Sequence, residues 1–499
     1  MEAYDAVVIG AGNGGLTGAA ALAQAGLKVL LLERHNVPGG CATSFCRGRF
    51  EFEVALHQLS GLGRPERPGP LRSVFERLGI LNDLTFVEIP ELYRVVLPGA
   101  LDLTLPSDRA ELIEVLGDRF PAEEDNVARF FDLLYRFAGE VFGAHYFNDP
   151  QVTREKYPLL FEYAFRSAAD VLDEYFTDPV LKAVLSVYWG YIGVPPGHMA
   201  FAWLAILFLA YLEFKPFHLQ GGSQALSNAL LSRFQALGGT ARLNCGAARI
   251  ELKDGVVAAV VLEDGERVST RYILSNASPM TVFGQLIGAD QAPAGVFQSL
   301  KRMEVGHSGF VIFIGLDCEP GDIGLATATN FLLSHTDLRD RPLREMRELG
   351  LGTELKVLSC HDIADPTFSP PGACQLGLVT LKYAEPWLRV PPTQYFRVKH
   401  ACAQVMVDQA AQVCPGLRDH IEEIEVATPL THMRYLGHPA GSIYGFTRYL
   451  KDGPFTAPSP PDQVKGLYFA GGWAGDHGFQ GTLSSGVSRA NAIISDLKA

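Results

Sequence analysis

The sequence is poor in charge. Lys, Arg, Asp and Glu make up 19% of its 499 residues, against about 25% in typical soluble proteins. Acids dominate the charges that are present, with 55 Asp and Glu, 42 Lys and Arg, and a net charge of −13. Nucleic-acid binding normally needs a basic surface, so we expect no nucleic-acid partner. The content of 47% hydrophobic and 10% aromatic residues excludes a disordered chain.

Cysteine patterns that indicate metal or disulfide frameworks are also absent. The eight cysteines contain no CxxC pair and no Cys/His zinc spacing, which predicts reduced thiols and no metal site. The first residues carry the acids Glu2 and Asp5 ahead of an apolar stretch. A secretory signal begins with a basic region instead, so we expect a cytoplasmic protein.

The sequence lacks a long apolar run, although residues 183–212 contain no Lys, Arg, Asp or Glu. Their continuous apolar part, Met199–Leu212, is shorter than the roughly 20 residues of a membrane-spanning helix. Three interpretations remain: a spanning helix, a buried helix that lines a long apolar pocket, or a patch that lies on a bilayer. The pocket-lining helix is favoured, and it is compatible with peripheral contact to the inner face of a membrane.

Glycine, by contrast, is abundant, with 51 residues. A predicted strand over Tyr4–Ile9 runs into a G-x-G-x-x-G loop, a helix over Leu16–Gly26, a strand over Lys28–Leu32, and Glu33. This order is the complete βαβ fingerprint of dinucleotide binding. The residues predicted to form the cofactor-binding loop are Gly10, Gly12, Asn13, Gly14 and Gly15: Gly10 permits the tight turn, Gly12 lets backbone approach the pyrophosphate, and Gly15 lets helix and strand pack closely. Glu33 is predicted to accept hydrogen bonds from the ribose hydroxyls.

The segment after Glu33 favours FAD over NAD. Arg34 follows directly, and a glycine doublet, Gly39-Gly40, comes six residues after Glu33. Flavoproteins of the glutathione-reductase type use such a doublet to bring backbone close to FAD. The chain has no second complete fingerprint for NAD(P)H. We therefore predict FAD, with Arg34, Gly39, Gly40 and Cys41 beside it. GxxxxGK[ST], HExxH and GxSxG motifs are absent.

The run GGCATSFCRGRFEFEVALHQLSG, residues Gly39–Gly61, resembles the family of carotenoid desaturases, carotenoid isomerases and retinol saturases. The similarity is greatest to the saturase branch, which has a Phe-Asp-x-Gly-x-His pattern at the end of a hairpin. This chain departs from that pattern at Glu53 and Ala55 but keeps a histidine, His57. Cys41 stands where the phytoene-desaturase branch has Arg, which shifts weight toward isomerases and saturases.

Two further stretches, Leu219–Ile250 and Gly466–Ala492, are similar to the second FAD segment and the C-terminal flavin motif of that family. The resemblance implies that Ala247 lies at the adenine. It also implies a glycine-rich loop and a helix beginning near Gly481 at the flavin. The residues placed there are Gly472, Asp476, Gly481 and Thr482.

The resemblance implies an α/β fold with a glutathione-reductase-type Rossmann FAD-binding domain, into which a helical and β-sheet substrate domain is inserted. The predicted FAD-binding parts are residues 1–75, 216–290 and 451–499. The helical part is 76–215, and the sheet and loops of the substrate domain are 291–450. Within these parts we expect helices over 125–147 and 157–176, strands over Val256–Leu262, Arg267–Leu274, Phe310–Leu316 and Leu376–Lys382, and a loop over Thr431–Phe446.

The resemblance also implies a reaction at carbon–carbon bonds of a hydrophobic polyene, by desaturation, saturation or cis–trans isomerisation, with flavin N5 as the redox centre. His57 and Glu53 are the candidate catalytic residues. The alternatives are that backbone hydrogen bonds satisfy His57 and that Glu53 only caps the hairpin. Tyr435 and Tyr444 are candidates to line the substrate pocket. Oxygen, a quinone or a redox-neutral cycle fits the absence of a nicotinamide site.

Two other functions remain open. A flavin amine oxidase would usually have Arg after the glycine doublet and an aromatic cage near the C-terminal motif, for which Trp473 gives weak support. A lipid-binding escort protein of the same fold would lack catalysis. Such proteins tend to lose the fingerprint glycines, which this chain retains together with Glu33. Oligomeric state cannot be read from the sequence.

Overall fold

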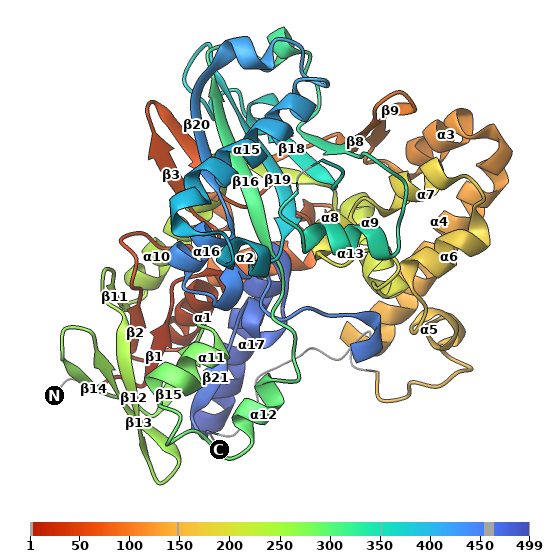
Figure 1. The fold of residues 1–499 in the computed structure, drawn as a ribbon. Helices are drawn as coiled ribbons and strands as arrows, with labels where there is room; N and C mark the ends of the chain where they lie inside the picture. Colours follow the sequence, from red (N-terminus) through yellow and green to blue (C-terminus); the bar gives the residue numbers. More distant parts are fainter. Residues whose placement is uncertain (1–2, 147–148, 351, 454–463, 499) are drawn as a thin grey trace.

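A five-stranded parallel sheet forms the centre of the computed structural model, which describes residues 3–146, 149–350, 352–453 and 464–498 (Figure 1). In spatial order its strands are β11 (Thr240–Arg242), β2 (Val29–Leu32), β1 (Ala6–Ile9), β15 (Tyr272–Ser275) and β21 (Leu467–Phe469). They come from three distant stretches of the chain, because parallel neighbours need crossover connections. The division into five segments stays a prediction, and residues 454–463 of its last segment lie outside the described residues.

Side chains alternate between the two faces of this sheet, as the pleat of a strand requires. Ala6 and Val8 of β1 pack against helices, whereas Val7 and Ile9 pack against a second sheet. The helices are α1 (Asn13–Gln24), α10 (Gly222–Ala236) and α17 (Gly478–Lys498). The second sheet is antiparallel and consists of β12 (Ala247–Lys253), β13 (Val256–Leu262) and β14 (Arg267–Ser269). The central sheet is therefore covered on both faces, and its inner strands β1 and β2 are accordingly apolar throughout, whereas the edge strand β11 is half-buried.

One predicted strand is divided. Residues Arg267–Leu274, expected to be continuous, form β14 in the antiparallel sheet and β15 in the central sheet. The break falls at Thr270, whose hydroxyl donates to the carbonyls of Asp5 (3.3 Å) and Tyr272 (3.0 Å). These bonds hold the chain where it leaves an antiparallel partner for a parallel one.

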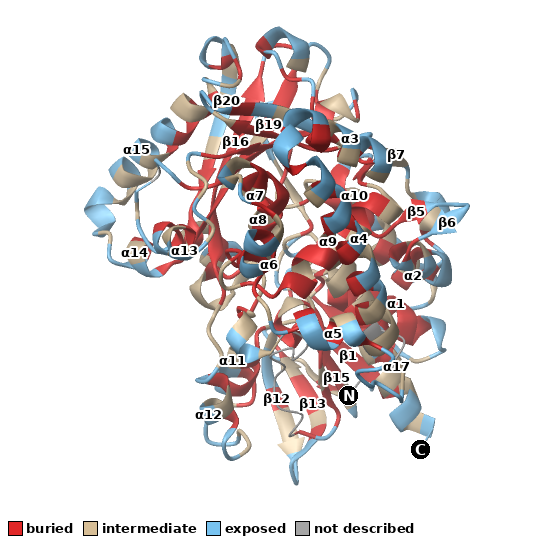
Figure 2. Ribbon diagram, turned by 90° about the vertical axis from the view of Figure 1, so that its right-hand side faces the viewer, coloured by how far each residue is buried: buried red, intermediate tan, exposed pale blue. Residues whose placement is uncertain are grey.

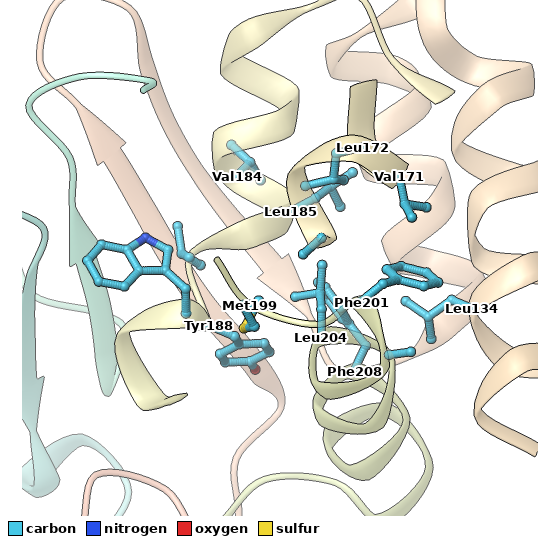
Figure 3. Packing of buried hydrophobic residues seen from close by; sticks show 14 of the residues in the cluster. Leu134, Val171, Leu172, Val184, Leu185, Tyr188, Met199, Phe201, Leu204 and Phe208 are labelled. Atoms are coloured by element: carbon cyan, nitrogen blue, oxygen red, sulfur yellow. The ribbon is translucent and has the colours of Figure 1, made fainter. Parts of the chain in front are cut away.

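Helices form a separate lobe beside the sheets (Figure 1). Their common core includes Leu134, Leu172, Val184, Phe201 and Phe208 (Figure 3). None of the described helices is long and apolar enough to cross a membrane. The lobe contains α3 (Arg109–Arg119), α4 (Glu124–Val141), α5 (Pro158–Tyr163), α6 (Ala168–Tyr175), α7 (Pro179–Ser186), α8 (Trp189–Ile192) and α9 (Phe201–Phe214). The expected helices over 125–147 and 157–176 are confirmed as α4, α5 and α6, while Phe147 lies outside the described residues.

A seven-stranded mixed sheet adjoins the helical lobe, whose core includes Tyr93 and Phe331 of this sheet. Its second and third strands pair antiparallel with Phe310 opposite Thr380, which confirms the predicted strands in this region. Ile312 and Leu378 point to helix α15 (Pro392–Ala410), whereas Val311 and Val379 face a cavity. In spatial order the strands are β20 (Ile421–Ala427), β16 (Ser308–Leu316), β19 (Cys374–Lys382), β18 (Lys356–Cys360), β17 (Thr329–Leu332), β8 (Glu91–Leu97) and β9 (Leu101–Pro106).

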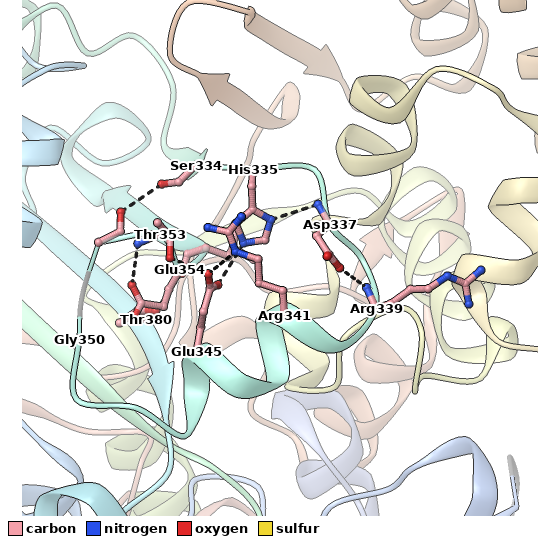
Figure 4. A network of polar contacts seen from close by, with 12 residues as sticks. Ser334, His335, Asp337, Arg339, Arg341, Glu345, Gly350, Thr353, Glu354 and Thr380 are labelled. Atoms are coloured by element: carbon pink, nitrogen blue, oxygen red, sulfur yellow. Dashed lines mark hydrogen bonds and ion pairs between the residues drawn. The ribbon is translucent and has the colours of Figure 1, made fainter.

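A polar network ties a long connection to this sheet (Figure 4). The carboxylate of Glu345, in α13 (Asp340–Met346), accepts hydrogen bonds from Arg341 (2.8 Å) and Thr353 (2.6 Å) and contacts His335 (3.1 Å). The buried ammonium of Lys382 donates to the backbone carbonyl of Glu345 at 2.7 Å. Buried polar groups need such partners, and here they fix α13 and Thr353 against the end of β19.

The prediction of a loop over Thr431–Phe446 is wrong in the first half of that segment. Residues Pro429–Leu436 form helix α16, whose N-cap hydroxyl on Thr428 accepts from the backbone N–H of Leu430 at 3.2 Å. Proline at the first helical position and a polar N-cap are the usual start signals of a helix. The C-terminal helix α17 begins at Gly478 rather than near Gly481. Figure 2 shows buried residues concentrated in the interior, in strands such as β16 and β19 and in helices such as α9, and exposed residues at the periphery, for example in α15.

Candidate cofactor and substrate site

A cavity of about 1520 Å³ lies between the central sheet, the helical lobe and the seven-stranded sheet. Pockets for small ligands usually measure about 300–1,000 Å³, so this one can hold a dinucleotide together with a second molecule. Glycine-rich loops line one part of it, which we call the cofactor part. Aromatic and aliphatic side chains line the other, the apolar part, which consists of Trp189, Tyr191, Trp203, Ile206, Leu207, Ala210, Tyr211, Leu355, Val357, Val379 and Leu381.

The loop between β1 and α1 makes the tightest turn of the cofactor part. Gly10 has φ +92°, a left-handed conformation that suits glycine. A Cβ on Gly15 would lie 1.9 Å from the carbonyl oxygen of Gly10, so that no side chain fits there. Helix α1 begins at Asn13 and directs its first free N–H groups to the cavity edge, where a helix terminus favours negatively charged phosphate.

Asn276 completes this loop, although the sequence did not single it out as a site residue. Its amide nitrogen lies 2.4 Å from the position of a Cβ on Gly12, and its amide oxygen 2.3 Å from that of a Cβ on Gly471. Asn276 directly follows β15, the parallel neighbour of β1, so both strands end at the same edge of the sheet. The pairing of two predicted strands was therefore the signal that could have identified it.

Glu33 stands at the end of β2 with its carboxylate held by backbone. One oxygen accepts from the N–H of Ala11 at 2.7 Å, and the other accepts from the N–H of His35 at 2.8 Å. Each carboxylate oxygen has a further lone pair, and the side chain lines the cavity. The group is thus oriented to accept hydrogen bonds from a vicinal diol such as the ribose of a dinucleotide.

Arg34 and Ala247 lie on either side of this carboxylate in the cavity wall. The guanidinium of Arg34 donates to the backbone carbonyl of Tyr435 at 3.0 Å and so ties the loop after β2 to helix α16. Ala247 is the first residue of β12, next to Gly246, whose N–H donates to the carboxylate of Glu263 at 2.9 Å. The main contribution of Arg34 is therefore to hold two cavity walls together.

The glycine doublet lies against the phosphate loop. The N–H of Gly39 donates to the carbonyl of Ala11 at 2.8 Å, and a Cβ on Gly39 would lie 2.0 Å from the carbonyl oxygen of Ala42. Gly40 and Cys41 line the cavity directly after it. Burial raises the pKa of the Cys41 thiol to about 11. The thiol is therefore protonated at neutral pH and is a packing group rather than a nucleophile.

The C-terminal motif supplies a second helix N-terminus. Gly472, Asp476, Gly481 and Thr482 all line the cavity, the last two in the first turns of α17. Thr482 accepts a hydrogen bond from the side-chain amide of Asn13 at 3.3 Å, which joins the two helix starts. Burial raises the pKa of the Asp476 carboxyl, although a hydrogen bond from Ser485 and the charges of Arg448 and Arg489 oppose this.

These groups fit FAD. Among the described residues, the side-chain oxygen of Asn13 is buried at the start of α1 and has no hydrogen-bond partner. The N-termini of α1 and α17 both face the cavity, where positive partial charge can stabilise the pyrophosphate and the anionic side of a reduced flavin. When bound, FAD supplies the exchange of two electrons and a hydride with a substrate.

His57 lies in the turn after the hairpin of β3 (Ser44–Arg47) and β4 (Phe50–Glu53), at the junction of the two cavity parts. Its ring lies 5.8 Å from that of Tyr191 in α8, and in the described part of the chain no hydrogen bond to its imidazole is found. Burial lowers the pKa of His57 to about 4, so the ring is neutral at pH 7. A neutral imidazole offers one donor and one acceptor.

The structure does not bring Glu53 to the cavity as a partner of His57. Its two carboxylate oxygens accept hydrogen bonds from the N–H groups of Ala55 (3.0 Å) and Leu56 (2.9 Å) and from the N–H (2.6 Å) and hydroxyl (2.7 Å) of Ser223. Burial raises the pKa of Glu53 despite these bonds. Glu53 joins the turn that carries His57 to the start of α10, which fits the alternative of a capping role, and a catalytic role for this carboxylate stays a prediction.

The charge-free segment contributes one face of α9 to the apolar part. Trp203, Ile206, Leu207, Ala210 and Tyr211 line the cavity at helical spacing, and the other face packs in the core of the lobe. Of the three interpretations of this segment, a buried helix that lines a pocket describes what is found. Tyr444 also lines the cavity, whereas Tyr435 lies at its rim and is 53% exposed.

Several further histidines line the cavity, among them His307 and His477, which were not predicted as site residues. His307 is buried, its Nδ1 lies 3.2 Å from the carbonyl of Ser308, and burial lowers its pKa to about 4. His477 stacks on Tyr444 at a centroid distance of 5.7 Å, and burial lowers its pKa to about 3. His307 belongs to none of the motifs described above and is brought to the site by the tertiary fold, whereas His477 directly follows Asp476 within the C-terminal flavin motif, which was the signal that could have identified it.

Known proteins share this architecture. The chain resembles putrescine oxidase in a solved structure with a TM-score of 0.68, 16% identity and 99% coverage of both chains. It also resembles an oxidoreductase from Methanosarcina mazei with a TM-score of 0.66, 17% identity and 99% and 100% coverage. These identities establish the fold alone.

Sequence relatives match over nearly the full chain. All-trans-retinol 13,14-reductase of Danio rerio is 26% identical over 99% of this chain and 86% of its own length. Prolycopene isomerase 2 of an Oncidium hybrid cultivar is 25% identical over 99% and 84%. A family model described as flavin containing amine oxidoreductase matches residues 14–387. The predicted α/β fold and FAD cofactor are therefore confirmed, and the chain belongs to the family of flavin containing amine oxidoreductases.

Proposed function

We propose that the protein is an FAD-dependent oxidoreductase or isomerase that acts on carbon–carbon bonds of a hydrophobic polyene of the carotenoid or retinoid class. The observation that carries this proposal is the apolar part of the cavity, which the charge-free helix α9 and one face of the seven-stranded sheet build beside the cofactor part. The relatives named retinol reductase and prolycopene isomerase act on molecules of this shape.

The chain's own residues would perform three tasks in such a reaction. The side chains of Trp203 and Leu207 exclude water and hold an extended apolar molecule against the cofactor part. The N-terminus of α17 stabilises negative charge there. His57, at the junction, holds or releases a proton next to the reacting bond. Desaturation, saturation and isomerisation all remain open, because each uses the same placement.

The charges of the cavity disfavour the two rival functions. Its acidic lining residues are Glu33, Glu263, Glu425 and Asp476, and all belong to the cofactor part or the rim. The apolar part therefore offers no carboxylate to an ammonium group, as an amine oxidase substrate would require. A lipid escort without catalysis has no use for two helix N-termini and an oriented Glu33 carboxylate.

A spectrum and a substrate panel test the proposal. The purified protein should show flavin absorption near 450 nm and release FAD on heating. The dithionite-reduced and the oxidised enzyme are then incubated without oxygen with all-trans-retinol, all-trans-lycopene and prolycopene, and with putrescine as the amine arm. A polyene band shift with a flavin change supports the proposal. Flavin reduction by putrescine alone, or no response to any polyene, overturns it.

A peripheral membrane contact is part of this proposal, since an apolar substrate resides in lipid. Phe161 of α5 and nearby Phe165 are 44% and 74% exposed on the helical lobe. Their substitution by Ser should weaken cosedimentation with zwitterionic vesicles. Phe396 of α15, 72% exposed on a separate face, provides the matched control. Equal binding of all variants would remove the contact from the proposal.

A further inference from the structure

A second, much smaller cavity adjoins the main one at His57. It measures about 10 Å³ and is lined by polar groups of Glu53, His57, Ser359, His361 and Gln375 among apolar residues. This is close to the space of a single water molecule. His57 thus separates the main cavity from the small one, because it lines both. His361 lies on the far side of the small cavity.

Behind His361 lies a second buried imidazole. His361 starts a short 3-10 turn after β18, and His218 belongs to β10 (Phe217–Leu219). Their ring centroids are 5.3 Å apart with an angle of 31° between the planes, and Phe368 packs against both rings. The two histidines are only 7% and 3% exposed, so they form a pair of polar rings inside an apolar shell.

A carboxylate ends this row next to the surface. Nε2 of His218 lies 3.5 Å from Oδ2 of Asp365, which is itself 3% exposed; among the described residues this nitrogen has no hydrogen-bond partner, so Asp365 is its nearest charged neighbour rather than a bonded one. The other oxygen of Asp365 accepts hydrogen bonds from the hydroxyl (2.6 Å) and N–H (3.1 Å) of the exposed Thr367. The row His57, His361, His218, Asp365 therefore runs from the main cavity to one residue below solvent.

We propose that His361, His218 and Asp365 form a buried proton relay that connects solvent with His57 in the cavity. The inference rests on the proposed function for its reaction, but the row of groups exists independently of the substrate. His57 is the group that meets the substrate, and the other three are positioning and transfer residues that act through it.

The relay delivers to His57 the proton that its neutral ring does not store. Burial holds the pKa of His57 at about 4, so only about one ring in a thousand carries a stored proton at pH 7. A neutral imidazole can accept a proton at one nitrogen while it gives one from the other, and a row of them moves a proton without a lasting buried charge.

The burial and the neighbouring charges of each imidazole shift its pKa in the direction that a proton relay needs. Burial lowers the pKa of His361 well below its usual range, and the neighbouring His218 and His57 lower it further, so it too stays neutral. Burial also lowers the pKa of His218, but the carboxylate of Asp365 opposes this. Asp362 beside His361 is occupied by the N–H groups of Ser369 (2.8 Å) and Gln375 (2.9 Å), and Glu53 by the bonds described above.

When a double bond is saturated, it gains two electrons and two hydrogens. The reduced cofactor would supply a hydride with both electrons and be oxidised, and His57 would supply a proton. His57 regains that proton through His361 and His218 from solvent at Asp365. The two electrons come from an external reductant, which in the assay is dithionite. Desaturation runs the same path in reverse.

A measurement without substrate tests the links. Deuterium exchange at the C2 position of each histidine, followed by peptide mass spectrometry against pH in the FAD-loaded protein, gives a midpoint for each ring. Asp365→Asn should lower the midpoint of His218, and His57→Gln should raise that of His361, each by roughly 0.5–1 pH unit, because an attractive or a repulsive partner is lost. The surface pair His420 and Asp317, 2.9 Å apart, is the control, and His420→Gln should move neither. If the midpoints of His218 and His361 did not move, these groups would not influence one another and the relay would be ruled out.

The transfer itself is tested by the rate at which dithionite-reduced enzyme consumes all-trans-retinol. His361→Gln should lower this rate at least tenfold at pH 7. Above the pKa of His57 the variant's rate should fall tenfold per pH unit, because it depends on direct protonation of His57. The wild-type rate should fall less steeply, and imidazole should restore His361→Ala. Equal rates and pH profiles in FAD-loaded variants would overturn the relay. A wild-type enzyme inert toward every polyene would overturn the proposed function instead, and the exchange midpoints would still decide the relay.

Discussion

The two parts of the main cavity differ in what forms their walls, which is backbone in one and side chains in the other. In the cofactor part, backbone forms the wall: Gly10, Gly15 and Gly39 allow segments of the chain to approach closely, and two helix starts direct N–H groups to the cavity. In the apolar part, side chains of α9 and of the seven-stranded sheet form the wall. A backbone-built wall tolerates no added atom, whereas a side-chain wall changes its shape with each substitution. This difference lets one fold keep its cofactor while its substrate varies.

The strongest test of this contrast adds one methyl group to the cofactor part. Gly15→Ala places a Cβ 1.9 Å from the carbonyl oxygen of Gly10, so the phosphate loop must open. We expect nearly complete loss of bound FAD, measured as the ratio of absorbance at 450 and 280 nm. Gly139→Ala, at an exposed helical position in α4 with no atom within 4 Å, is the control. It should retain FAD and gain about 0.5–1 kcal/mol of stability. Normal FAD content in Gly15→Ala would contradict the contrast.

Removal of a single cofactor contact should have a smaller effect. Glu33→Ala deletes the carboxylate at the end of β2 and its two backbone bonds to Ala11 and His35. Hydrogen bonds to a charged group are worth about 1.5–3 kcal/mol, so FAD should bind roughly 10–100-fold more weakly in reconstitution of the apoprotein followed by flavin fluorescence. Exposed Glu51→Ala is the control. Unchanged affinity in Glu33→Ala would remove this residue from the ribose site.

The apolar part should respond in the opposite sense. Ala210→Phe introduces a ring into the cavity from α9. We expect normal FAD content and at least a tenfold lower rate with all-trans-lycopene, with a smaller loss for the shorter all-trans-retinol. The neighbouring Leu209 does not line the cavity, and Leu209→Phe should leave the length preference unchanged. Equal losses on both polyenes would mean that Ala210 does not limit the length of the pocket.

The smallest effect is expected at Cys41, where the two parts meet. Because burial raises its thiol pKa to about 11, only about one thiol in a thousand is ionised at pH 8. Iodoacetamide at that pH should modify exposed Cys46 and spare Cys41, as peptide mass spectrometry would reveal. Cys41→Ser should keep FAD and lie within about threefold of the wild-type rate. Rapid alkylation of Cys41, or a covalent flavin link, would contradict this.

How much the sequence could predict follows the same division. The fingerprint glycines, Glu33 and the doublet were readable because backbone approach demands specific residue types at fixed spacing. Asn276 was not readable, since its role depends on which strands pair. His307 was missed because side-chain walls are assembled from distant segments without a motif. His477 stands inside the C-terminal flavin motif, but nothing in the motif alone shows that its ring faces the cavity. The hydrogen-bond partners of Glu53 were not readable for a related reason, as only the position of Ser223 reveals which way its carboxylate points.

The strand divided at Thr270 and the helix at Pro429–Leu436 show a second limit. The local sequence pattern identified an apolar run that ends in β15. It did not show that the chain changes its strand partner within this run, because that change depends on how two different sheets are arranged. The start signals of α16 were present in the sequence, as Thr428 precedes Pro429. They were outweighed by the glycines that follow, which belong to the loop after the helix rather than to the helix itself.

The central sheet has a consequence for how the protein is made. Its strand β21 and the helix α17 that closes the flavin loop come from the last 33 residues, and α17 packs closely on α1 near the other end of the chain. The flavin-binding site is therefore assembled from segments at opposite ends of this sequence, and α1 gains its helical partner only after the segments between them have been made. Cofactor capture in this fold thus depends on a contact that forms late in folding.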